Sequence, residues 1–246
     1  MSSLYRSILN AQGSAFASTN SFEFDGNTDY VDIGNPTNLN TITNISISAW
    51  FKTTSTVDGL VIVGSDDATQ GRRYILRTKS SSGMKLRFMS FSSNSSFTDI
   101  VGTTNINDGN WHHVMAINDG TNLKLYVDGA LDNSNTNGHA INTTFATPDV
   151  NIGRRTYSGN ENYFDGKIDE VAIWGNDQSA NVSTIYGTGV PNDLTTLSPL
   201  GWWRMGEAAN YAGGQWTLTD QGSGGNNGTS TTLPAPPAQP STDVPT

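Results

Sequence analysis

The sequence predicts an all-β fold built from two antiparallel sheets, and two observations support this. The first is a series of Asp-Gly and Asn-Gly dipeptides, which tolerate the positive φ angles of tight hairpin turns. The second is a set of short runs rich in β-branched and aromatic residues between these turns, which indicates a sandwich or a barrel. The dipeptides begin at Asp25, Asp58, Asp108, Asp119, Asp128, Asn137, Asp165 and Asn227, and the runs lie at 45–51, 60–63, 74–76, 85–89, 123–127 and 150–152.

The run at 45–51 shows the alternation of a strand. Its two isoleucines and its alanine share one face, whereas Ser46, Ser48 and Trp50 share the other. We expect the serine face to be the wetter one, because strands usually alternate between core and solvent. A long helical pattern is missing, and the best helix candidate is the stretch of about two turns at 179–186.

Composition narrows the class of protein. The chain has 246 residues, no cysteine, 14% charged residues and a net charge of -9. Such a length suits one large sandwich or two small domains. The negative charge argues against binding to a nucleic-acid backbone, which requires a basic surface. We expect no membrane insertion, since no apolar run approaches the roughly 20 residues that a spanning helix needs.

The two ends of the chain differ from the middle. Residues 1–20 form a polar arm without the apolar stretch of a signal peptide. Five of the nine prolines lie between Pro234 and Pro245, so residues 233–246 form a Pro-rich tail that we expect to be extended. Neither end has a core of its own. We therefore expect at least one of them to become ordered against a partner protein.

Three motifs combine a strand with an Asp-Gly turn. They are Ser-Phe-Glu-Phe-Asp-Gly at 21–26, Trp-His-His-Val at 111–114 followed by Leu-Tyr-Val-Asp-Gly at 125–129, and Phe-Asp-Gly-Lys-Ile-Asp-Glu-Val at 164–171. In this order they resemble the laminin-G-like, concanavalin-A-like family of jelly rolls. The resemblance covers roughly residues 21–187 and implies a two-sheet jelly-roll sandwich, a fold that mostly binds ligands and only sometimes catalyses.

The segment at 188–232 also resembles this family, but in an unusual position. Trp202-Trp-Arg-Met-Gly-Glu207 and the Gly/Asn-rich stretch at 220–229 look like the segment with which such domains usually begin. The segment either returns to fill the same place in its own sandwich, which we favour, or completes a neighbouring subunit. In both cases Trp202 or Trp203 is expected in the core. We also expect burial of three further tryptophans, Trp50, Trp111 and Trp174.

His112 and His113 are adjacent, which suggests a paired-imidazole metal site. Adjacent residues of a strand point to opposite faces, however, so the two rings cannot easily share an ion. We therefore predict a structural role for this pair, in packing and hydrogen bonding.

Three aspartates are candidate metal ligands. The resemblance implies one Ca²⁺ where the early Asp-Gly turn, with Asp25 and Asp29, meets the late strand that carries Asp169. Carboxylate oxygens are the ligands that Ca²⁺ prefers. The alternative is that Asp25 and Asp29 cap turns while Asp169, expected to be partly desolvated, accepts backbone N–H groups.

The loop at 154–163 is the densest mixture of aromatic and polar residues in the chain. Aromatic rings suit the C–H faces of sugars, and guanidinium or amide groups suit their hydroxyls. The loop is therefore a candidate glycan site, with an ordinary hairpin loop as the alternative. Its candidate ligand-binding residues are Arg154, Arg155, Tyr157, Asn160, Glu161 and Tyr163.

Catalysis is not expected. Retaining glycoside hydrolysis requires two carboxylates about 5–5.5 Å apart, and no two of the four glutamates, Glu23, Glu161, Glu170 and Glu207, have the spacing that would supply them from one strand. Asp169 and Glu170 are expected to point to opposite faces. The motifs of serine hydrolases, zinc proteases and P-loop proteins are also missing from the sequence.

These features favour a non-catalytic structural protein of a phage particle. The resemblance extends to structural proteins of marine tailed phages, with a polar arm before the jelly roll. A protein made in the cytoplasm and exposed on the particle needs neither a signal peptide nor disulfides. Expected partners are other virion proteins or further copies of the chain, and a host surface glycan. The alternatives are an extracellular carbohydrate-binding or adhesion module of a bacterial surface and, less favoured, an unrecognised hydrolase.

Overall fold

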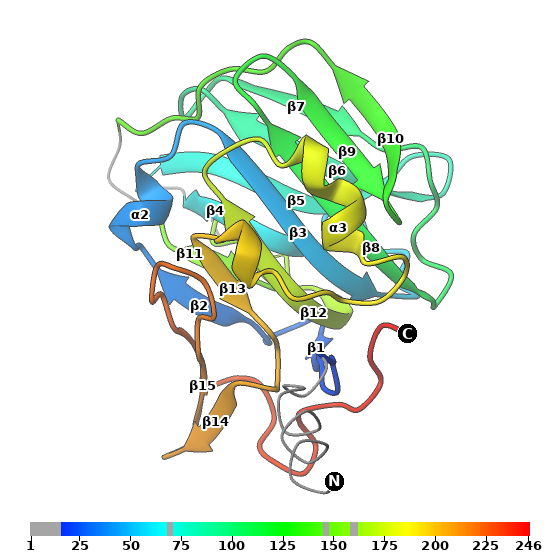
Figure 1. Cartoon of the computed structure of the whole chain (residues 1–246), viewed down its shortest axis with the longest axis vertical. Helices are drawn as coiled ribbons and strands as arrows, with labels where there is room; N and C mark the ends of the chain where they lie inside the picture. The colour runs from blue at the N-terminus through cyan, green and yellow to red at the C-terminus, as the bar shows by residue number, and fades with distance from the viewer. Residues whose placement is uncertain (1–15, 68–70, 145–147, 158–161) are drawn as a thin grey trace, which may run out of the picture.

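The computed structural model describes residues 16–67, 71–144, 148–157 and 162–246. These residues form two antiparallel sheets that pack face to face (Figure 1). The predicted all-β, two-sheet jelly-roll sandwich is confirmed.

The first sheet follows the order β1-β12-β3-β8-β9-β10, and β13 lies along the same edge of β12 as β1. Its strands are β1 (Phe22–Asp25), β12 (Asp165–Trp174), β3 (Ile45–Lys52), β8 (Trp111–Asn118), β9 (Leu123–Val127), β10 (Ala130–Asn135) and β13 (Gly201–Trp203).

The second sheet follows the order β14-β15-β16-β2-β11-β4-β5-β6-β7. Its strands are β14 (Ala209–Ala212), β15 (Gln215–Leu218), β16 (Gly228–Ser230), β2 (Val31–Gly34), β11 (Val150–Ile152), β4 (Val61–Asp67), β5 (Gly71–Ser80), β6 (Met84–Phe91) and β7 (Phe97–Val101).

Helical segments are short and lie outside the two sheets. They are α2 (Thr37–Asn40), the 3-10 turn η1 (Ser179–Asn181), α3 (Val182–Tyr186) and the 3-10 turn η2 (Thr195–Leu197). The helix predicted at 179–186 is thus confirmed as η1 followed by α3. None of the helices in the described part of the chain has the length and apolar character needed to cross a bilayer.

The main core lies between the sheets. Alternate residues of each strand point inward, as in Phe22 and Phe24 of β1 or Leu86 and Phe88 of β6, and these side chains are almost fully buried. Burial of this continuous apolar layer is the dominant favourable contribution to folding.

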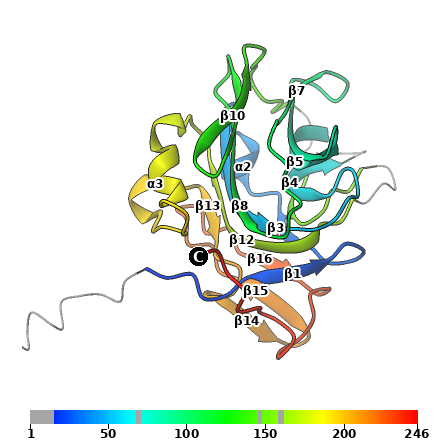
Figure 2. The same ribbon diagram turned by 90° about the vertical axis from the view of Figure 1, so that its right-hand side faces the viewer.

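The outer face of the first sheet is also dry, which corrects the expectation of a wet serine face. Ser46 and Ser48 are buried. The segment with α3 packs over this face (Figure 2) and adds a second apolar cluster, to which Trp174 and Trp202 belong. Alternation along one strand cannot reveal such a cover, because the covering residues come more than 130 positions later. The Ser48 hydroxyl instead lies 2.8 Å from Nε2 of buried His113.

The histidine pair has the structural role that the sequence predicts. Nδ1 of His112 lies 2.8 Å from Oδ2 of Asp128, whereas His113 faces Ser48 on the other side of β8. The hydrogen bond with Asp128 raises the pKa of His112, and burial lowers the pKa of His113 to about 4. The two imidazoles therefore do not share a site.

The segment at 188–232 joins both sheets of its own chain. β13 pairs with β12, and β16 pairs with β2, so that β15 and β14 extend the second sheet. Trp202 and Trp203 are 2% and 0% exposed, which confirms their predicted place in the core.

The tail is ordered against its own sandwich. Ser241 forms a bridge with Ser21 next to β1, and Nε2 of Gln239 donates to the backbone carbonyl of Glu23. The carboxylate of Asp243 accepts hydrogen bonds from Lys52, Lys167 and the indole of Trp111. Figure 1 shows the red C-terminal segment close to blue β1.

Two of the three burial predictions for tryptophan are confirmed. Trp50 is 3% exposed and Trp174 is 2% exposed. Trp111 is less deeply buried than these two, with intermediate exposure. It lies at the start of β8, where Asp243 of the tail covers its polar edge.

Candidate ligand-binding face

The candidate loop lies between β11 and β12. Arg154, Arg155, Tyr157 and Tyr163 are all half-buried. The other two candidates, Asn160 and Glu161, lie outside the described residues.

Arg155 and Tyr157 belong to a cluster at the end of β4. Asp66 is buried, and its carboxylate lies 2.7 Å from Nη2 of Arg155 and 3.0 Å from Nε of Arg72. The guanidinium carbons of Arg72 and Arg155 lie 4.1 and 4.9 Å from the ring centre of Tyr157. We call Asp66, Arg72, Arg155 and Tyr157 the arginine–tyrosine cluster. Its two cations and one anion leave it with a net positive charge.

Arg154 points to a different set of neighbours. Its guanidinium carbon lies 3.3 Å from the ring centre of Tyr30, and its Nε donates to Oδ1 of Asn151 over 3.0 Å. The structure therefore separates the two adjacent arginines of the candidate loop. Arg154 supports the junction of β2 and β11, and Arg155 supports the end of β4.

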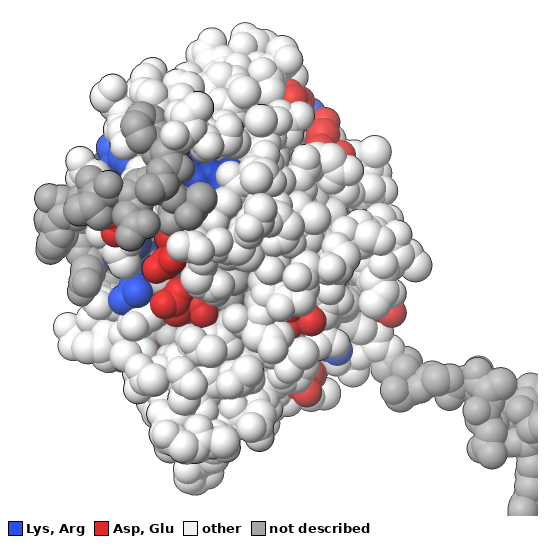
Figure 3. Space-filling view, turned by 90° about the vertical axis from the view of Figure 1, so that its left-hand side faces the viewer, with Lys and Arg blue, Asp and Glu red and all other residues white. Residues whose placement is uncertain are grey.

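An apolar layer lies on the outer side of the second sheet. Val61, Ile75, Met89 and Phe91 come from β4, β5 and β6 and are buried together. The guanidinium carbon of Arg72 stands 4.5 Å from the ring centre of Phe91, so the arginine–tyrosine cluster lies beside this layer. On one side of the face shown in Figure 3, basic and acidic side chains gather next to each other.

The cluster offers the groups that saccharide recognition uses. Guanidinium groups donate hydrogen bonds in fixed directions, and a half-buried aromatic ring offers an apolar surface. Among the described residues, Nε of Arg155 has no hydrogen-bond partner although it is buried. A buried donor without a partner is costly, and a ligand acceptor that reached it would recover that cost.

Sequence reasoning missed Asp66 and Arg72. Both flank the hairpin between β4 and β5, with the acid before the turn and the base after it. This opposite-charge pattern was a usable signal for a cross-strand pair. Its connection to Arg155, about 90 positions later, depends on the pairing of β11 with β4.

Asp25 and Asp29 lie together at the turn after β1. Oδ1 of Asp25 accepts the backbone N–H groups of residues 27–29, and Oδ2 of Asp29 accepts that of Asp25. Burial, followed by the charge of Asp25, raises the pKa of Asp29 to about 6. Both carboxylates therefore have the turn-capping contacts of the alternative interpretation.

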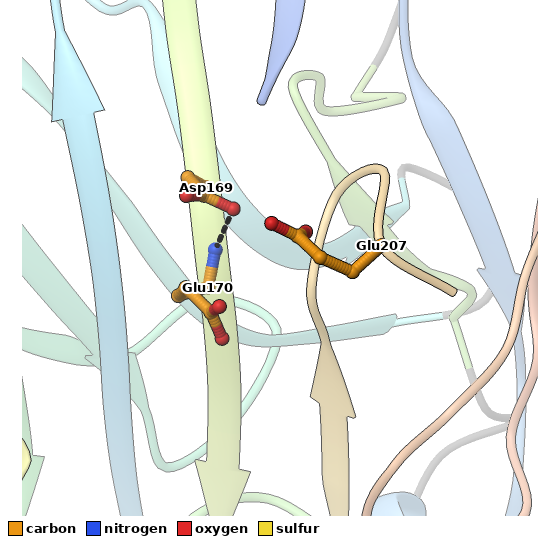
Figure 4. Close-up of side chains that lie close together, drawn as sticks. All are labelled: Asp169, Glu170 and Glu207. Atoms are coloured by element: carbon orange, nitrogen blue, oxygen red, sulfur yellow. Dashed lines mark hydrogen bonds between the residues drawn. The ribbon is translucent and has the colours of Figure 1, made fainter. Parts of the chain in front are cut away.

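Asp169 does not join them. Strand pairing places Asp25 opposite Asp165, four residues away along β12. Asp169 belongs instead to an acidic cluster with Glu170 and Glu207, in which one carboxylate oxygen of each residue lies within 4.8 Å of the others (Figure 4). The three predicted calcium ligands thus occupy two separate places.

The expectation that Asp169 and Glu170 point to opposite faces is wrong. The pairing of β12 with β3 shifts between Asp169 and Ala172, and Glu170 has a φ of 47°. This bulge turns both carboxylates to the same side, since an extra residue breaks the alternation of a strand. The bulge lies between the positions on β12 where β1 and β13 pair.

Hydrogen-bond donors from two segments contact the acidic cluster. Ser18 donates to Asp169, Trp202 Nε1 and Arg204 Nε donate to Glu170, and the backbone N–H groups of Thr19 and Asn20 donate to Glu207. Burial, with the charge of Glu170 as a second cause, raises the pKa of Asp169 well above its usual value. Burial also raises the pKa of Glu170 to about 7.

Two of the three carboxylates of the acidic cluster are shielded from solvent. Asp169 is 0% exposed and Glu170 is 3% exposed. The ring of Phe16 stacks on Trp202 at 5.9 Å between ring centres and lies 4.1 Å from the guanidinium carbon of Arg204. These contacts cover Asp169 and Glu170 with described residues that precede β1, whereas Glu207 is half-buried.

A wide depression of about 570 Å³ lies elsewhere, between α2, the end of β12 and η2. It is uncharged, and Trp174 contributes only a buried ring to it. Its lining shares no residue with the candidate loop or the arginine–tyrosine cluster.

A family model of the concanavalin A-like lectin/glucanases superfamily, Laminin_G_3, matches residues 25–181. The chain therefore belongs to this superfamily, as its motifs and its two-sheet sandwich indicate. No protein of curated function matches the chain by sequence.

Solved structures share the fold at low sequence identity. One is a protein of Bacteroides ovatus that is proposed to bind carbohydrate, with 17% identity and a TM-score of 0.66 over 87% of this chain and 58% of that one. Another is the heptameric SAP-like pentraxin of Limulus polyphemus, with 16% identity and a TM-score of 0.55 over 70% and 84%. A third is the CBM40 of the Ruminococcus gnavus IT-sialidase bound to α2,3-sialyllactose, with 15% identity and a TM-score of 0.51 over 67% and 95%. The chain thus spans 58% of the length of the B. ovatus protein.

Proposed function

We propose that the protein is a non-catalytic glycan-binding module and that the arginine–tyrosine cluster contacts the glycan. The observation that carries this proposal is the grouping of two guanidinium groups and a half-buried tyrosine beside an apolar layer. Binding sites for small polar ligands combine such an apolar surface with a few fixed polar groups.

The relatives support the same class of ligand. The B. ovatus protein is proposed to bind carbohydrate, and the R. gnavus module is bound to sialyllactose. Burial within the acidic cluster supports the non-catalytic part of the proposal. Within the described ranges, Asp169, Glu170 and Glu207 are the one group of three acidic or histidine residues whose ligand atoms converge, and contacts from Phe16 and Ser18 help to bury Asp169 and Glu170.

We further propose that the module belongs to a phage particle, where it would bind a glycan of the host surface. The cysteine-free, weakly charged composition and the resemblance to tailed-phage structural proteins support this setting. Mass spectrometry of purified virions tests it, since the chain must be present in stoichiometric amounts. If the protein is found only in the secreted or surface fraction of bacteria, it is a bacterial adhesion module instead.

Calcium at the turn after β1 is a separate proposal. Asp25 and Asp29 supply carboxylate oxygens of the kind that Ca²⁺ prefers. Burial and the charge of Asp25 raise the pKa of Asp29, and a bound cation would counteract both effects. Asp169 fits the ion less well, because its oxygens already accept hydrogen bonds from Ser18 and from the Glu170 backbone.

A glycan array tests the proposed function. The labelled full chain is applied to immobilised oligosaccharides and polysaccharides of bacterial, algal and animal origin, and the supernatant is analysed for released sugar. We expect binding to a restricted set of related glycans and no release. Uniform absence of binding, or cleavage of a bound glycan, would contradict the proposal.

A further inference from the structure

Four cations form two cross-strand pairs on the outer face of the second sheet. In the register of β5 and β6, Arg77 lies opposite Arg87, and Lys79 lies opposite Lys85. The next pair on the same face, Ile75 opposite Met89, belongs to the apolar layer. We call Arg77, Lys79, Lys85 and Arg87 the basic stripe.

Like charges directly opposite each other destabilise a sheet unless other groups compensate them. Three members of the stripe have such partners. Arg87 pairs with Asp99 at 2.7 Å, Lys79 pairs with Asp58 at 3.1 Å, and Nζ of Lys85 donates to Oδ1 of Asn105 over 2.7 Å.

Arg77 is the exception. No hydrogen bond or ion pair joins its side chain to any residue in the described part of the chain, and its buried Nε is without a partner. Burial lowers its pKa, and the neighbouring charge of Arg87 lowers it further. The charge of Arg155 also lowers the pKa of Arg77, whereas the charges of Asp58 and Asp99 raise it.

The position of Arg77 links the stripe to the arginine–tyrosine cluster. Nη1 of Arg77 packs against Gly59, so closely that a Cβ atom at this glycine would lie only 2.7 Å from it. The side-chain amide of Asn162 lies next to the same glycine. Asn162 and Arg155 both belong to the candidate loop. A half-buried guanidinium that pairs with no described residue thus lies near two further guanidinium groups and an amide.

We propose that Arg77, together with Arg87 and Arg155, binds the acidic group of a saccharide, either a carboxylate or a sulfate ester. This inference rests on the proposed glycan binding and specifies the class of glycan. A planar guanidinium binds such anions through two parallel hydrogen bonds, and these are stronger than bonds between neutral groups. The anion would also offset the repulsion between Arg77 and Arg87. A neutral saccharide supplies no such compensation.

The experiment uses matched pairs of glycans. Each acidic glycan, sialylated, uronate-containing or sulfated, is immobilised beside its neutral core without the acidic group. The full chain, Arg77→Gln and Lys124→Gln are compared on all pairs. Lys124 lies on β9 of the other sheet and pairs with Asp119 and Asp177, so its substitution removes the same charge at a distant place. Melting temperatures confirm that both variants are folded.

We expect the full chain to bind at least one acidic form about tenfold or more tightly than its neutral core, a difference typical of one charge-assisted contact. Arg77→Gln should lose this preference, and Lys124→Gln should keep it. The sialylated and uronate arms report a carboxylate, and the sulfated arm reports a sulfate ester.

Two results would overturn the inference and leave the proposed function intact. They are equal binding of acidic and neutral forms, and an unchanged preference in Arg77→Gln. Binding of double-stranded DNA as tight as that of the acidic glycan would also overturn the inference, because the basic stripe would then attract any polyanion without specificity. If no glycan of either form binds, the proposed function fails as well, so the two failures can be distinguished.

Discussion

The hydroxyl of Ser18 donates a hydrogen bond of 2.6 Å to Oδ2 of Asp169, which lies 151 residues later in the chain. This contact closes the acidic cluster from the side of the arm. Among the described residues, one cation pairs with this cluster: Nε of Arg204 lies 2.9 Å from Oε1 of Glu170. Ionisation of all three carboxyl groups therefore leaves excess negative charge in a buried place, which is costly for the folded state.

The first prediction concerns Glu207→Gln. Oε1 of Glu207 accepts two backbone N–H groups, whereas its buried Oε2 has no partner, so an amide nitrogen can replace Oε2 without losing a bond. Removal of one negative charge should stabilise the fold at pH 8 by about 1 kcal/mol, which corresponds to a rise in melting temperature of about 2–4 °C.

The stabilisation should decrease on acidification. The pKa of Asp169 and that of Glu170 are raised in the folded state, so protonation of the cluster favours folding. This contribution is full below the unfolded pKa values near 4 and is lost as the pH rises through about 7. Thermal melts at pH 5.5 and pH 8 measure the difference, with exposed Glu23→Gln as the control. An equal effect at both pH values would contradict the account of the cluster.

The second prediction concerns the docking of the tail. Burial opposes the ionisation of Asp243, but hydrogen bonds from Lys167, Trp111 and Lys52 hold its pKa below the usual range. Asp243→Ala should therefore lower the stability by about 1 kcal/mol at neutral pH, since surface ion pairs contribute about 0–1 kcal/mol each.

Loss of this carboxylate should also expose the indole of Trp111, which shifts tryptophan emission to longer wavelength. The difference in stability should be full above about pH 4 and decrease progressively below it, as the pH falls toward the depressed pKa of Asp243 in the folded chain. Identical melting and emission of variant and wild type would mean that the tail does not dock through Asp243.

The third prediction concerns calcium. If Asp25 and Asp29 hold Ca²⁺, excess chelator should lower the melting temperature, because an ion bound only to the folded state stabilises it. Asp29→Asn should abolish this response, and Asp169→Asn should retain it. Unchanged melting in chelator, together with no metal in elemental analysis, leaves only the turn-capping role of the two aspartates.

Local chemistry explains how much of the fold could be predicted. Asp128 and Gly129 have φ angles of 50° and 76° and connect β9 to β10, as an Asp-Gly turn should. The bulge at Glu170 has no comparable signal, since glutamate rarely adopts a positive φ and the surrounding strands impose it. The burial of Ser48 also could not be predicted from its own strand, because the segment with α3 that packs over this face comes much later in the chain.

The candidate site could likewise be predicted only where local sequence determines it. The loop with Arg155 and Tyr157 was recognised from its composition. The partners of the loop, Asp66 and Arg72, and also Arg77, become neighbours only through the register of β4, β5 and β6. A shift of one residue in that register would move each of these side chains to the opposite face.

The central claim is that the arginine–tyrosine cluster binds glycan, and calorimetric titration tests it most directly. The glycan selected on the array is titrated into the full chain, into Tyr157→Ala and into Tyr211→Ala, where Tyr211 is a half-buried tyrosine of β14 beside Trp216 at the other edge of the sheet. We predict binding about tenfold or more weaker in Tyr157→Ala, as for loss of one central aromatic contact, and unchanged affinity in Tyr211→Ala. Full affinity in Tyr157→Ala would contradict the claim and place the site elsewhere on the molecule.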